Sequence, residues 1–327
     1  MNKNYIAIVG ATGLVGRTLI KIFEENNTNN HYVIHLYASE NSVGKRIKYK
    51  NQSLKVKSLN KPIVISYDFV FLMTEKEISK KCVEIFKNSK YIIDNSSAFR
   101  LEKGVPLLVP EINFEAGKNF KLFANPNCTT AICALPIYEI AKEFGVSRVN
   151  VTTMQAVSGS GKNGIKALKD VELSKNIYGY DITKTCVCKI GALKENGYFE
   201  EECKIIDELR KILNDYELKI SSTCIRVPIK NCHSAVISLT LKKEFNLDAI
   251  KQILISCNEI IYLEEAENYL PNSIIASGSN KIYCGRLRLD LSCNNTILLY
   301  VCSDNLRRGA AYNAYKIMEY LQKNDSL

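Results

Sequence analysis

Short apolar runs alternate with amphipathic stretches through the first third of the chain. This pattern predicts strands at residues 5–9, 32–37, 69–73 and 91–93, with helices at residues 14–23 and 78–86 between them. Strands that alternate with helices are typical of a parallel, doubly wound sheet. Right-handed crossovers bring the carboxyl ends of such strands to one edge, which is where this kind of sheet binds ligands.

The pattern changes after a polar turn at residues 125–130. Segments rich in β-branched residues, at 149–154, 221–227, 235–241 and 282–291, predict a second sheet that is largely antiparallel or mixed. Helices are predicted at residues 164–173, 200–213 and 304–323. Because no repeat, low-complexity tract or flexible linker interrupts the sequence, the domain boundary is expected near Cys128.

The composition is that of a globular protein with room for two domains. The chain has 327 residues, of which 46% are hydrophobic and 24% charged. No apolar run reaches the ~18–20 residues that span a bilayer, and glycines interrupt the first apolar stretch too early for a signal peptide. The twelve cysteines lie mostly among apolar neighbours, which favours a reducing cytoplasm over a disulfide framework. With three histidines and no Cys-x-x-Cys pair, no metal site is predicted.

Part of the formal net charge of +10 is concentrated in one basic segment. Between Glu40 and Asp68 the chain has no acidic residue, but it has lysine or arginine at positions 45, 46, 48, 50, 55, 57 and 61. Two interpretations stay open: a solvated basic face, or attraction of anionic cofactors and substrates. Nucleic-acid binding is not predicted, because no recognised binding module accompanies the charge.

A glycine-rich turn follows the first predicted strand and opens the first helix. Gly10, Gly13 and Gly16 allow a tight turn and a close approach of the backbone to a pyrophosphate, and the amino end of the helix favours the anion. The alternative is a tight turn that binds no ligand. The strand–turn–helix context favours dinucleotide binding.

The end of the second strand is where such a fold reads the adenosine ribose. Glu40 is a candidate acceptor for a ribose 2′-hydroxyl, which favours NAD, whereas Lys45 or Arg46 suits the 2′-phosphate of NADP. The residues by themselves leave both cofactors open. His31 and His35 lie on or beside the same strand, where a structural role is expected.

Cys128 lies in a polar, proline-containing turn, between a strand-like segment at 122–124 and an apolar run at 131–140. Asn127 or Thr129 is a candidate cap for the helix that follows, which puts the thiol at or near the amino end of that helix. The helix dipole there favours the thiolate, which is the nucleophilic form. Cys128 is therefore the candidate acyl carrier, although the other cysteines compete for that role.

Candidate partners for this thiol follow predicted strands. Arg100 is a candidate clamp for a phosphate or carboxylate, the alternative being a surface ion pair. Gln155 ends a strand and is a candidate to orient a substrate by hydrogen bonds. At Ser158 and Gly159, which follow it, the backbone suits a close approach to a nicotinamide, and the alternative is a simple turn.

His233 is the only histidine outside the first predicted domain, and it is a candidate for the base that a cysteine nucleophile needs. A lone histidine is more often structural. Arg226, only seven positions earlier (233 − 226 = 7), together with the cysteine in a turn, favours the catalytic interpretation.

With these residues in view, the chain resembles the aspartate-semialdehyde dehydrogenase family along nearly its whole length. The matching motifs stand in the family's order: GATGLVG at 10–16, DNSSAFR at 94–100, VPEIN at 109–113, NPNCTT at 125–130, QAVSG at 155–159 and RVP…HS at 226–234. Segments 207–211, 285–290 and 304–310 also match. Chance does not produce so many motifs in one order.

The resemblance implies a fold, a division into domains and a reaction. The expected α/β fold has a Rossmann-type doubly wound parallel sheet domain at residues 1–127, completed by the C-terminal helix at 304–327. An α+β catalytic and dimerisation domain with a mixed sheet is expected at residues 128–303. The implied reaction reduces aspartyl β-phosphate to aspartate β-semialdehyde and releases inorganic phosphate, in the biosynthesis of lysine through diaminopimelate, and of methionine and threonine.

The resemblance also implies a role for each candidate residue. Cys128 forms a thioester, His233 acts as general acid and base, and Gln155 orients the acyl group. The implied substrate ligands are Arg226 for the carboxylate, Glu208 for the amino group, and Arg100 and Lys211 for the phosphate. Cofactor contacts are expected from Gly10, Thr12, Gly13, Leu14, Val15, Asn41, Ser42, Ser158, Gly159 and Asn305.

The implied cofactor is NADP, with NAD as the alternative. Asn41 bears on that choice, because it stands where many relatives carry an arginine that faces the 2′-phosphate. A cytoplasmic homodimer or homotetramer is expected, with no nucleic-acid or membrane partner. One alternative function is that of an N-acetylglutamyl-phosphate reductase, a family that usually has glycine where Asn127 stands. The other is a non-catalytic dinucleotide-binding relative, against which the intact set Cys128, Gln155, Arg226 and His233 argues.

Overall fold

The computed structural model describes residues 4–27, 32–264 and 270–325. The chain divides into two compact units: unit 1 comprises the residues up to Pro126 and those from Ala310 onward, and unit 2 is Asn127–Gly309. The sequence put these divisions after residue 127 and before residue 304. His31 and the last two residues of the predicted C-terminal segment lie outside the described residues.

Unit 1 contains a seven-stranded sheet. Its strands are β1 (Asn4–Val9), β2 (Tyr32–Tyr37), β3 (Arg46–Tyr49), β4 (Gln52–Lys57), β5 (Phe69–Leu72), β6 (Tyr91–Asp94) and β7 (Leu122–Ala124). Their order across the sheet is β3-β4-β2-β1-β5-β6-β7, and every neighbouring pair is parallel except β3 with β4.

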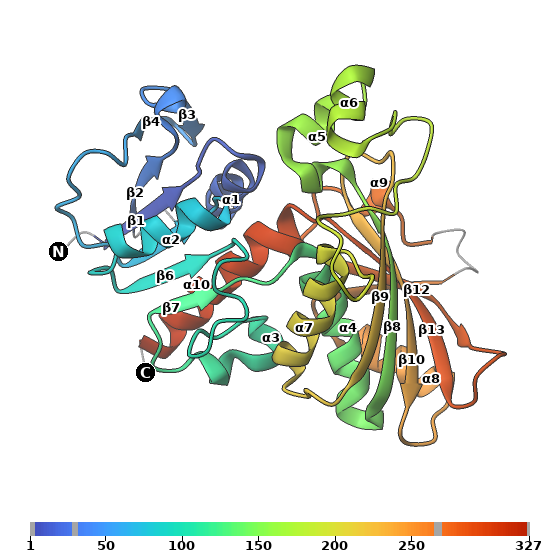
Figure 1. Ribbon diagram of the computed structural model, residues 1–327. Coiled ribbons are helices and arrows are strands. Elements are labelled where there is room, and N and C mark those ends of the chain that lie inside the picture. The colour runs from blue at the N-terminus through green and yellow to red at the C-terminus, as the bar shows by residue number, and fades with distance from the viewer. Residues whose placement is uncertain (1–3, 28–31, 265–269, 326–327) are drawn as a thin grey trace. The chain divides into compact units, whose positions relative to one another are not determined.

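Helices cover both faces of this sheet (Figure 1). The helical segments of unit 1 are α1 (Leu14–Glu25), α2 (Lys76–Ile85), α3 (Pro110–Asn113) and α10 (Tyr312–Asp325), with 3-10 turns η2 (Glu40–Ser42) and η3 (Phe114–Gly117). Helices α1 and α10 pack on one face, against side chains such as Ile8 and Leu36. Helix α2 covers the other face, against Val70 and Leu72. Because both faces are covered, the strands are buried, and the predicted doubly wound, mostly parallel sheet is confirmed.

Unit 2 contains a six-stranded mixed sheet. Its strands are β8 (Val146–Gln155), β9 (Lys219–Arg226), β10 (His233–Leu241), β11 (Ile260–Leu263), β12 (Ile282–Leu289) and β13 (Thr296–Ser303). Their order is β11-β12-β13-β10-β8-β9. The outer pairs β8–β9 and β11–β12 are parallel and the three inner pairings are antiparallel, so the predicted mixed sheet is confirmed.

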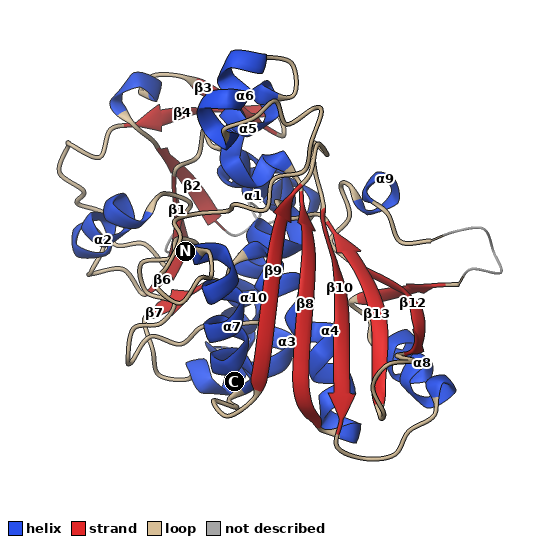
Figure 2. Cartoon of the chain, turned by 45° about the vertical axis from the view of Figure 1, so that its right-hand side comes forward, coloured by secondary structure: helices blue, strands red, loops and turns tan. Residues whose placement is uncertain are grey.

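The longer helices of unit 2 lie on one face of its sheet. The helical segments are α4 (Cys128–Phe144), η4 (Val157–Ser160), α5 (Gly161–Ala167), α6 (Val171–Tyr178), α7 (Glu200–Leu213), α8 (Leu247–Ser256) and α9 (Ser273–Ala276), with a π-helical turn at Arg307–Ala311. Figure 2 shows α4, α7 and α8 behind the strands. The short helix α9 packs at the end of β13 on the other face, where Ala276 clusters with Cys302 and Tyr300. Burial along β8 follows this arrangement, since Val149 and Val151 are buried while Asn150 and Thr152 are partly exposed.

Two predicted helices have the wrong bounds. The segment 164–173 forms parts of two helices, because the Asp170 carboxylate accepts a hydrogen bond from the Leu173 N–H and starts a new helix there. The C-terminal helix begins at Tyr312 rather than at Asp304. The Asp304 carboxylate accepts hydrogen bonds from the backbone N–H groups of Leu306 at 2.9 Å and Arg307 at 3.0 Å, and these bonds turn the chain before the helix.

The basic segment contains a β-hairpin, β3–β4, that the sequence did not predict. Its apolar and charged positions alternate, so that Ile47 and Tyr49 are buried while Arg46 and Lys48 face solvent. The strands β11 and β13 and the helix α8 were also missed. Within the described ranges, no helix is long and apolar enough to cross a membrane.

Candidate active site

The glycine-rich turn of unit 1 leaves no room for a side chain at two of its positions. A Cβ on Gly10, whose φ is +80°, would lie 2.1 Å from the Met73 carbonyl oxygen. A Cβ on Gly16 would lie 2.4 Å from the Gly10 carbonyl oxygen. Gly13 is the N-cap of α1 and has no side chain to cover the first N–H groups of the helix. The turn, which also contains the candidates Thr12, Leu14 and Val15, therefore has the form that a pyrophosphate requires.

The loop after β2 brings hydroxyl and ammonium groups together. Ser42 Oγ lies 3.5 Å from Thr12 Oγ1 and also 3.5 Å from Lys45 Nζ. Ser42 is buried, whereas Asn41 is exposed in the same turn. Two of the cofactor candidates, Thr12 and Ser42, are thus neighbours at the carboxyl ends of β1 and β2.

Glu40, the candidate ribose acceptor, has partners within its own unit. Its carboxylate accepts hydrogen bonds from Ser58 Oγ and from Asn60 Nδ2, the latter at 3.1 Å. Both donors follow β4, which the sequence did not predict. A ribose hydroxyl would therefore compete with two groups of the chain for this carboxylate.

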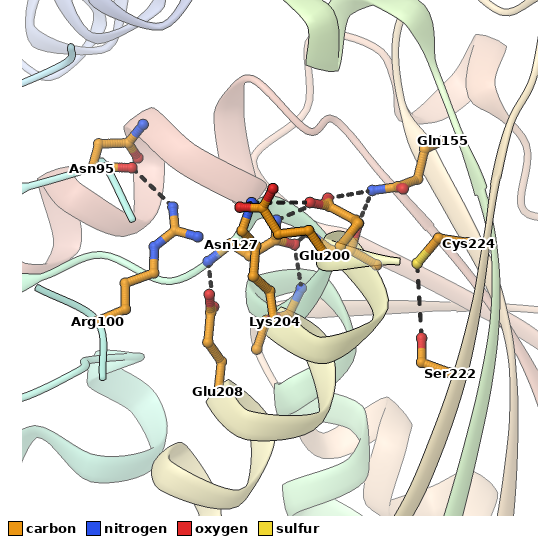
Figure 3. Close-up of polar contacts among 12 residues, drawn as sticks. Asn95, Arg100, Asn127, Gln155, Glu200, Lys204, Glu208, Ser222 and Cys224 are labelled. Atoms are coloured by element: carbon orange, nitrogen blue, oxygen red, sulfur yellow. Dashed lines mark hydrogen bonds and ion pairs between the residues drawn. The ribbon is translucent and has the colours of Figure 1, made fainter. Parts of the chain in front are cut away.

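Arg100 is held at the carboxyl ends of β6 and β7. Its Nη2 donates to the Asn95 carbonyl oxygen (Figure 3) and its Nε to the Asn125 carbonyl oxygen, each at 2.9 Å. The side chain is 8% exposed, so it is not the surface arginine of the alternative interpretation. Two backbone carbonyls fix the guanidinium at the ligand-binding edge of the sheet of unit 1.

In unit 2, Cys128 is the first residue of α4, and Asn127 caps that helix. Asn127 Oδ1 accepts from the backbone N–H of Thr129 at 2.9 Å and of Thr130 at 3.4 Å. Asn127, rather than Thr129, is thus the cap. A thiol at this position lies at the positive end of the helix dipole. Gly309 packs closely beside it, since a Cβ there would lie 3.0 Å from Cys128 Cβ.

Strand register brings three of the other candidates to one edge of the second sheet. Gln155 at the end of β8 lies opposite Arg226 at the end of β9. On the other side of β8, Met154 pairs with Ser234, which puts His233 at the start of β10 beside Gln155. These residues are far apart in sequence, and only the register of β9, β8 and β10 aligns them.

Gly159 lies against both Arg226 and His233. A Cβ on Gly159 would lie 2.8 Å from Arg226 Nη1 and 3.4 Å from His233 Nε2, so a side chain there would displace the guanidinium. Ala156 connects the same two side chains through its backbone: its carbonyl oxygen accepts from Arg226 Nη1 at 2.7 Å, and its N–H donates to His233 Nδ1 at 3.0 Å. The proton of the neutral imidazole therefore sits on Nε2.

His233 is held in its neutral form. Burial, and then the positive charge of Arg226, lower the pKa of His233 to about 3. The ring is 1% exposed, and its Nε2 is buried with no hydrogen-bond partner among the described residues. A buried N–H without a partner is costly unless a ligand supplies the acceptor, so this atom is a candidate hydrogen-bond donor to a ligand.

Two further cofactor candidates also lie in unit 2. Asn305 Nδ2 donates to Ser158 Oγ at 3.0 Å, and Asn305 Oδ1 accepts from the Cys232 N–H at 3.0 Å. Cys232 has a φ of +75°, a left-handed conformation that is costly for a residue with a Cβ, directly before His233. The sequence assigned Asn305 to the dinucleotide-binding domain, whereas it lies in unit 2 beside Ser158.

Helix α7 carries the two remaining substrate candidates on one face. Glu208, which is 1% exposed, accepts from the backbone N–H of Asn127 at 2.6 Å. Lys211 follows three positions later and is partly buried in the last turn. Glu201 lies two turns before Glu208 and contacts the same asparagine, but the sequence analysis missed it. The seven-residue spacing (208 − 201 = 7) puts Glu201 on the same helix face as Glu208, but spacing does not show what that face contacts.

The surroundings of other cysteines separate them from Cys128. Burial raises the pKa of Cys82 to about 11 and the pKa of Cys224 to about 12, so both thiols stay protonated at neutral pH. Burial likewise raises the pKa of Cys133, which is on the same helix as Cys128, and of Cys284. Among the residues that the structure describes, no group of three or more metal-ligating side chains is placed to hold a metal ion.

Comparison with known proteins assigns the two units to one family of enzymes. Residues 5–120 match the family "Semialdehyde dehydrogenase, NAD binding domain", and residues 137–308 match "Semialdehyde dehydrogenase, dimerisation domain". The chain is 37% identical to the aspartate-semialdehyde dehydrogenase of Aquifex aeolicus, over 97% of this chain and 98% of the relative. It is 36% identical to that of Rickettsia bellii, over 99% of both chains.

A solved structure agrees with these matches. Aspartate-semialdehyde dehydrogenase II of Vibrio cholerae, in complex with ASA, superposes with a TM-score of 0.92 at 31% identity, covering 99% of each chain. The fold and the two matched domains define a semialdehyde dehydrogenase, an oxidoreductase with a nicotinamide-dinucleotide-binding domain. Within that class, the chain belongs to the aspartate-semialdehyde dehydrogenase family, whose enzymes serve amino-acid biosynthesis.

The pKa of His233 generates the first prediction. Its imidazole should stay neutral from pH 8 down to about pH 4 in an NMR titration, since burial and Arg226 both disfavour the charged ring. Arg226→Gln should raise the pKa of His233 because it removes the charge, whereas Arg226→Lys, the matched control, should leave it low. A wild-type pKa near 6.5 would contradict the burial of this ring.

The lowered pKa of His233 also determines whether the free energy of unfolding rises or falls with pH. The unfolded chain binds a proton at His233 near pH 6.5, whereas the folded chain does so only near pH 3. The contribution of this residue to stability is therefore complete above pH 6.5 and is lost as the pH falls toward 3. At pH 5 the loss is about 2 kcal/mol, and urea unfolding at pH 7.5 and 5 measures it.

Proposed function

We propose that this enzyme catalyses the reductive dephosphorylation of aspartyl β-phosphate to aspartate β-semialdehyde, with Cys128 as the nucleophile and NADP as the preferred cofactor. The observation that carries the proposal is the grouping in unit 2. Cys128 begins α4, Gln155 donates to Thr129 Oγ1 in the first turn of that helix at 2.6 Å, and Arg226 and His233 share the edge of the sheet with Gln155. A thiol, a hydrogen-bonding amide, an anion clamp and an imidazole are the groups that acyl-phosphate chemistry needs.

In this mechanism the Cys128 thiolate attacks the β-acyl carbon of aspartyl β-phosphate. A carbon–sulfur bond forms, the carbon–oxygen bond to phosphate breaks, and inorganic phosphate leaves with the electron pair. The thioester that remains on Cys128 then accepts a hydride at the acyl carbon, and the resulting tetrahedral adduct releases aspartate β-semialdehyde and the thiolate. The covalent intermediate separates phosphate departure from reduction.

The buried polar groups suit the other steps. The Nε2–H of His233 can donate to the substrate oxygen that gains negative charge, since the neutral ring carries its proton on that atom. Arg226 is proposed to hold the substrate carboxylate, because a guanidinium offers two parallel donors to a planar anion. Glu208 is proposed as the ligand of the substrate amino group, with Arg100 and Lys211 as ligands of the phosphate.

The residues of the chain fit a dinucleotide cofactor. The turn of Gly10 and Gly16 has no space for side chains, and α1 begins without a side-chain cap, which together suit a pyrophosphate. Asn41, Ser42 and Lys45 are proposed to meet the adenosine ribose, and Ser158, Gly159 and Asn305 the nicotinamide end. When bound, the cofactor supplies the hydride.

The face of the second sheet that α4, α7 and α8 do not cover supports a homodimer. Val236 and Tyr300 are directly paired across β10 and β13, and Leu298 lies two positions along β13 on the same face. All three are partly exposed apolar side chains on the side that α4, α7 and α8 leave open. An apolar sheet face is favourably buried against a second copy, and the match to a dimerisation domain agrees with this.

Cys128→Ala should abolish aspartate-semialdehyde oxidation in the presence of phosphate while leaving NADP affinity nearly intact. The thiolate forms the covalent intermediate but does not hold the dinucleotide. Steady-state assays and cofactor titration measure the two effects, and Cys293→Ala, at an exposed cysteine, is the control that should keep full activity.

Intact-mass analysis of the wild type with substrate should show an acyl adduct, which peptide mapping should assign to Cys128. An adduct on Cys133, or substantial turnover by Cys128→Ala, would show that another thiol is the nucleophile. A steady-state assay with N-acetylglutamyl phosphate should give no turnover. Turnover with that substrate would favour the alternative function, that of an N-acetylglutamyl-phosphate reductase.

The cofactor preference generates another prediction. Asn41→Arg should raise the NADP-to-NAD ratio of kcat/KM by about ten- to a hundredfold, through one added charge-assisted contact to the 2′-phosphate. Asn51→Arg is the matched control, since it adds the same charge in the exposed turn between β3 and β4 and should change the ratio little. A wild type that prefers NAD, or equal effects of the two variants, would be evidence against a 2′-phosphate at position 41.

The assembly is tested by light scattering after gel filtration. The wild type should have twice the mass of the chain or a multiple of it, and Val236→Arg should shift it to monomer because a charge is then buried in the apolar contact. Val64→Arg, at a side chain of unit 1 that is 91% exposed, should leave the mass unchanged. A monomeric wild type would remove the proposed interface.

A further inference from the structure

Glu201 joins two side chains of the candidate active site. It is the second residue of α7 and is 9% exposed. Its Oε1 accepts from Asn127 Nδ2 at 2.9 Å and from Gln155 Nε2 at 3.0 Å. One carboxylate oxygen thus connects the cap of the helix that Cys128 begins with the amide at the end of β8.

A carboxylate can only accept hydrogen bonds, so Glu201 determines which end of each amide faces it. The NH₂ group of Asn127 must point to Glu201, which leaves its Oδ1 toward the N–H groups of Thr129 and Thr130. A flipped Asn127 would set an NH₂ group against those N–H groups and remove the cap. The contact with Glu201 therefore stabilises the start of α4 in the form that carries Cys128.

The same argument orients Gln155. Its Nε2 donates to both Glu201 Oε1 and Thr129 Oγ1, so its Oε1 must point the other way. That oxygen is buried and has no hydrogen-bond partner among the described residues. Gln155 itself is 0% exposed, so an unsatisfied acceptor is available at the site for a hydrogen-bond donor of the substrate.

The surroundings of Glu201 provide a countercharge. Lys204 Nζ lies 3.8 Å from Glu201 Oε2, one turn along the helix. The neighbouring Glu202 faces other groups: its carboxylate accepts from the Phe199 N–H at 2.7 Å and from the Cys224 N–H at 3.0 Å. Two adjacent buried glutamates therefore have separate partners, and only Glu201 contacts the amides.

We propose that Glu201 is a positioning residue of the reaction: through the amides of Asn127 and Gln155 it holds the start of α4 and presents Gln155 Oε1 to the substrate. Glu201 does not itself touch the reacting atoms. This inference rests on the proposed roles of Cys128 and Gln155. It predicts that the acceptor character of residue 201, and not only its size, controls turnover.

The test compares Glu201→Gln with Glu202→Gln in the full-length enzyme. Glu201→Gln keeps the volume but leaves a single acceptor oxygen. Its NH₂ group must face either the amides of Asn127 and Gln155 or the Lys204 ammonium, so kcat should fall about ten- to a hundredfold, with KM for the cofactor unchanged. Alkylation of Cys128 by iodoacetamide should slow as well, because the start of α4 is less ordered. Glu202→Gln should lower the melting temperature but keep kcat within about twofold of wild type.

A second variant keeps the inference testable if Glu201→Gln folds poorly. Glu201→Asp retains an acceptor on a shorter stem, and it should retain more kcat than Glu201→Gln. Equal or better turnover by Glu201→Gln, or a matching loss of kcat in Glu202→Gln, would overturn the positioning role. If Cys128→Ala remains active, the proposed function fails. If Cys128→Ala is inactive but Glu201→Gln keeps the kcat of the wild type, only the positioning role of Glu201 is overturned.

Discussion

The structure around Cys128 depends on the hydrogen bonds of one residue, Asn127. Its backbone N–H donates to Glu208, its side-chain N–H donates to Glu201, and its side-chain oxygen caps α4. Each group is buried, and a buried polar group left without a partner costs about 1–3 kcal/mol. Because all of them are satisfied at once, the turn before Cys128 has one favoured conformation, and α7 and α4 are coupled through it.

A second constraint is the burial of Arg226 beside His233. A guanidinium out of water needs acceptors, and the Ala156 carbonyl oxygen supplies one while the N–H of the same residue binds the imidazole. The charge and the burial together keep His233 neutral. Gly159 suits this arrangement because a side chain there would displace the guanidinium. The glycine that the sequence associated with a nicotinamide thus has a packing reason as well.

Much of the candidate site could be predicted from local sequence. The turn at Gly10, the helix start at Cys128 and the turn after Gln155 are local features, because capping and glycine conformations depend on neighbouring residues. The sequence did not predict the β3–β4 hairpin, although the hairpin lies in the segment without acidic residues. As a result, the hydrogen bonds of Ser58 and Asn60 to Glu40 could not be predicted. They matter for cofactor choice because a ribose hydroxyl would have to compete with them for the Glu40 carboxylate.

The sequence by itself determined the two kinds of sheet, the glycine turn and the identity of the nucleophile candidate, since each follows from residue order within a short segment. Tertiary structure alone decided that Gln155, Arg226 and His233 share one edge, because strand register between distant segments aligns them. It also decided that Asn127 rather than Thr129 caps α4 and that Glu201 faces that cap. A hydrogen bond between residues 74 positions apart, such as Asn127 with Glu201, leaves no periodic signal in the chain. It forms only once packing removes both groups from water.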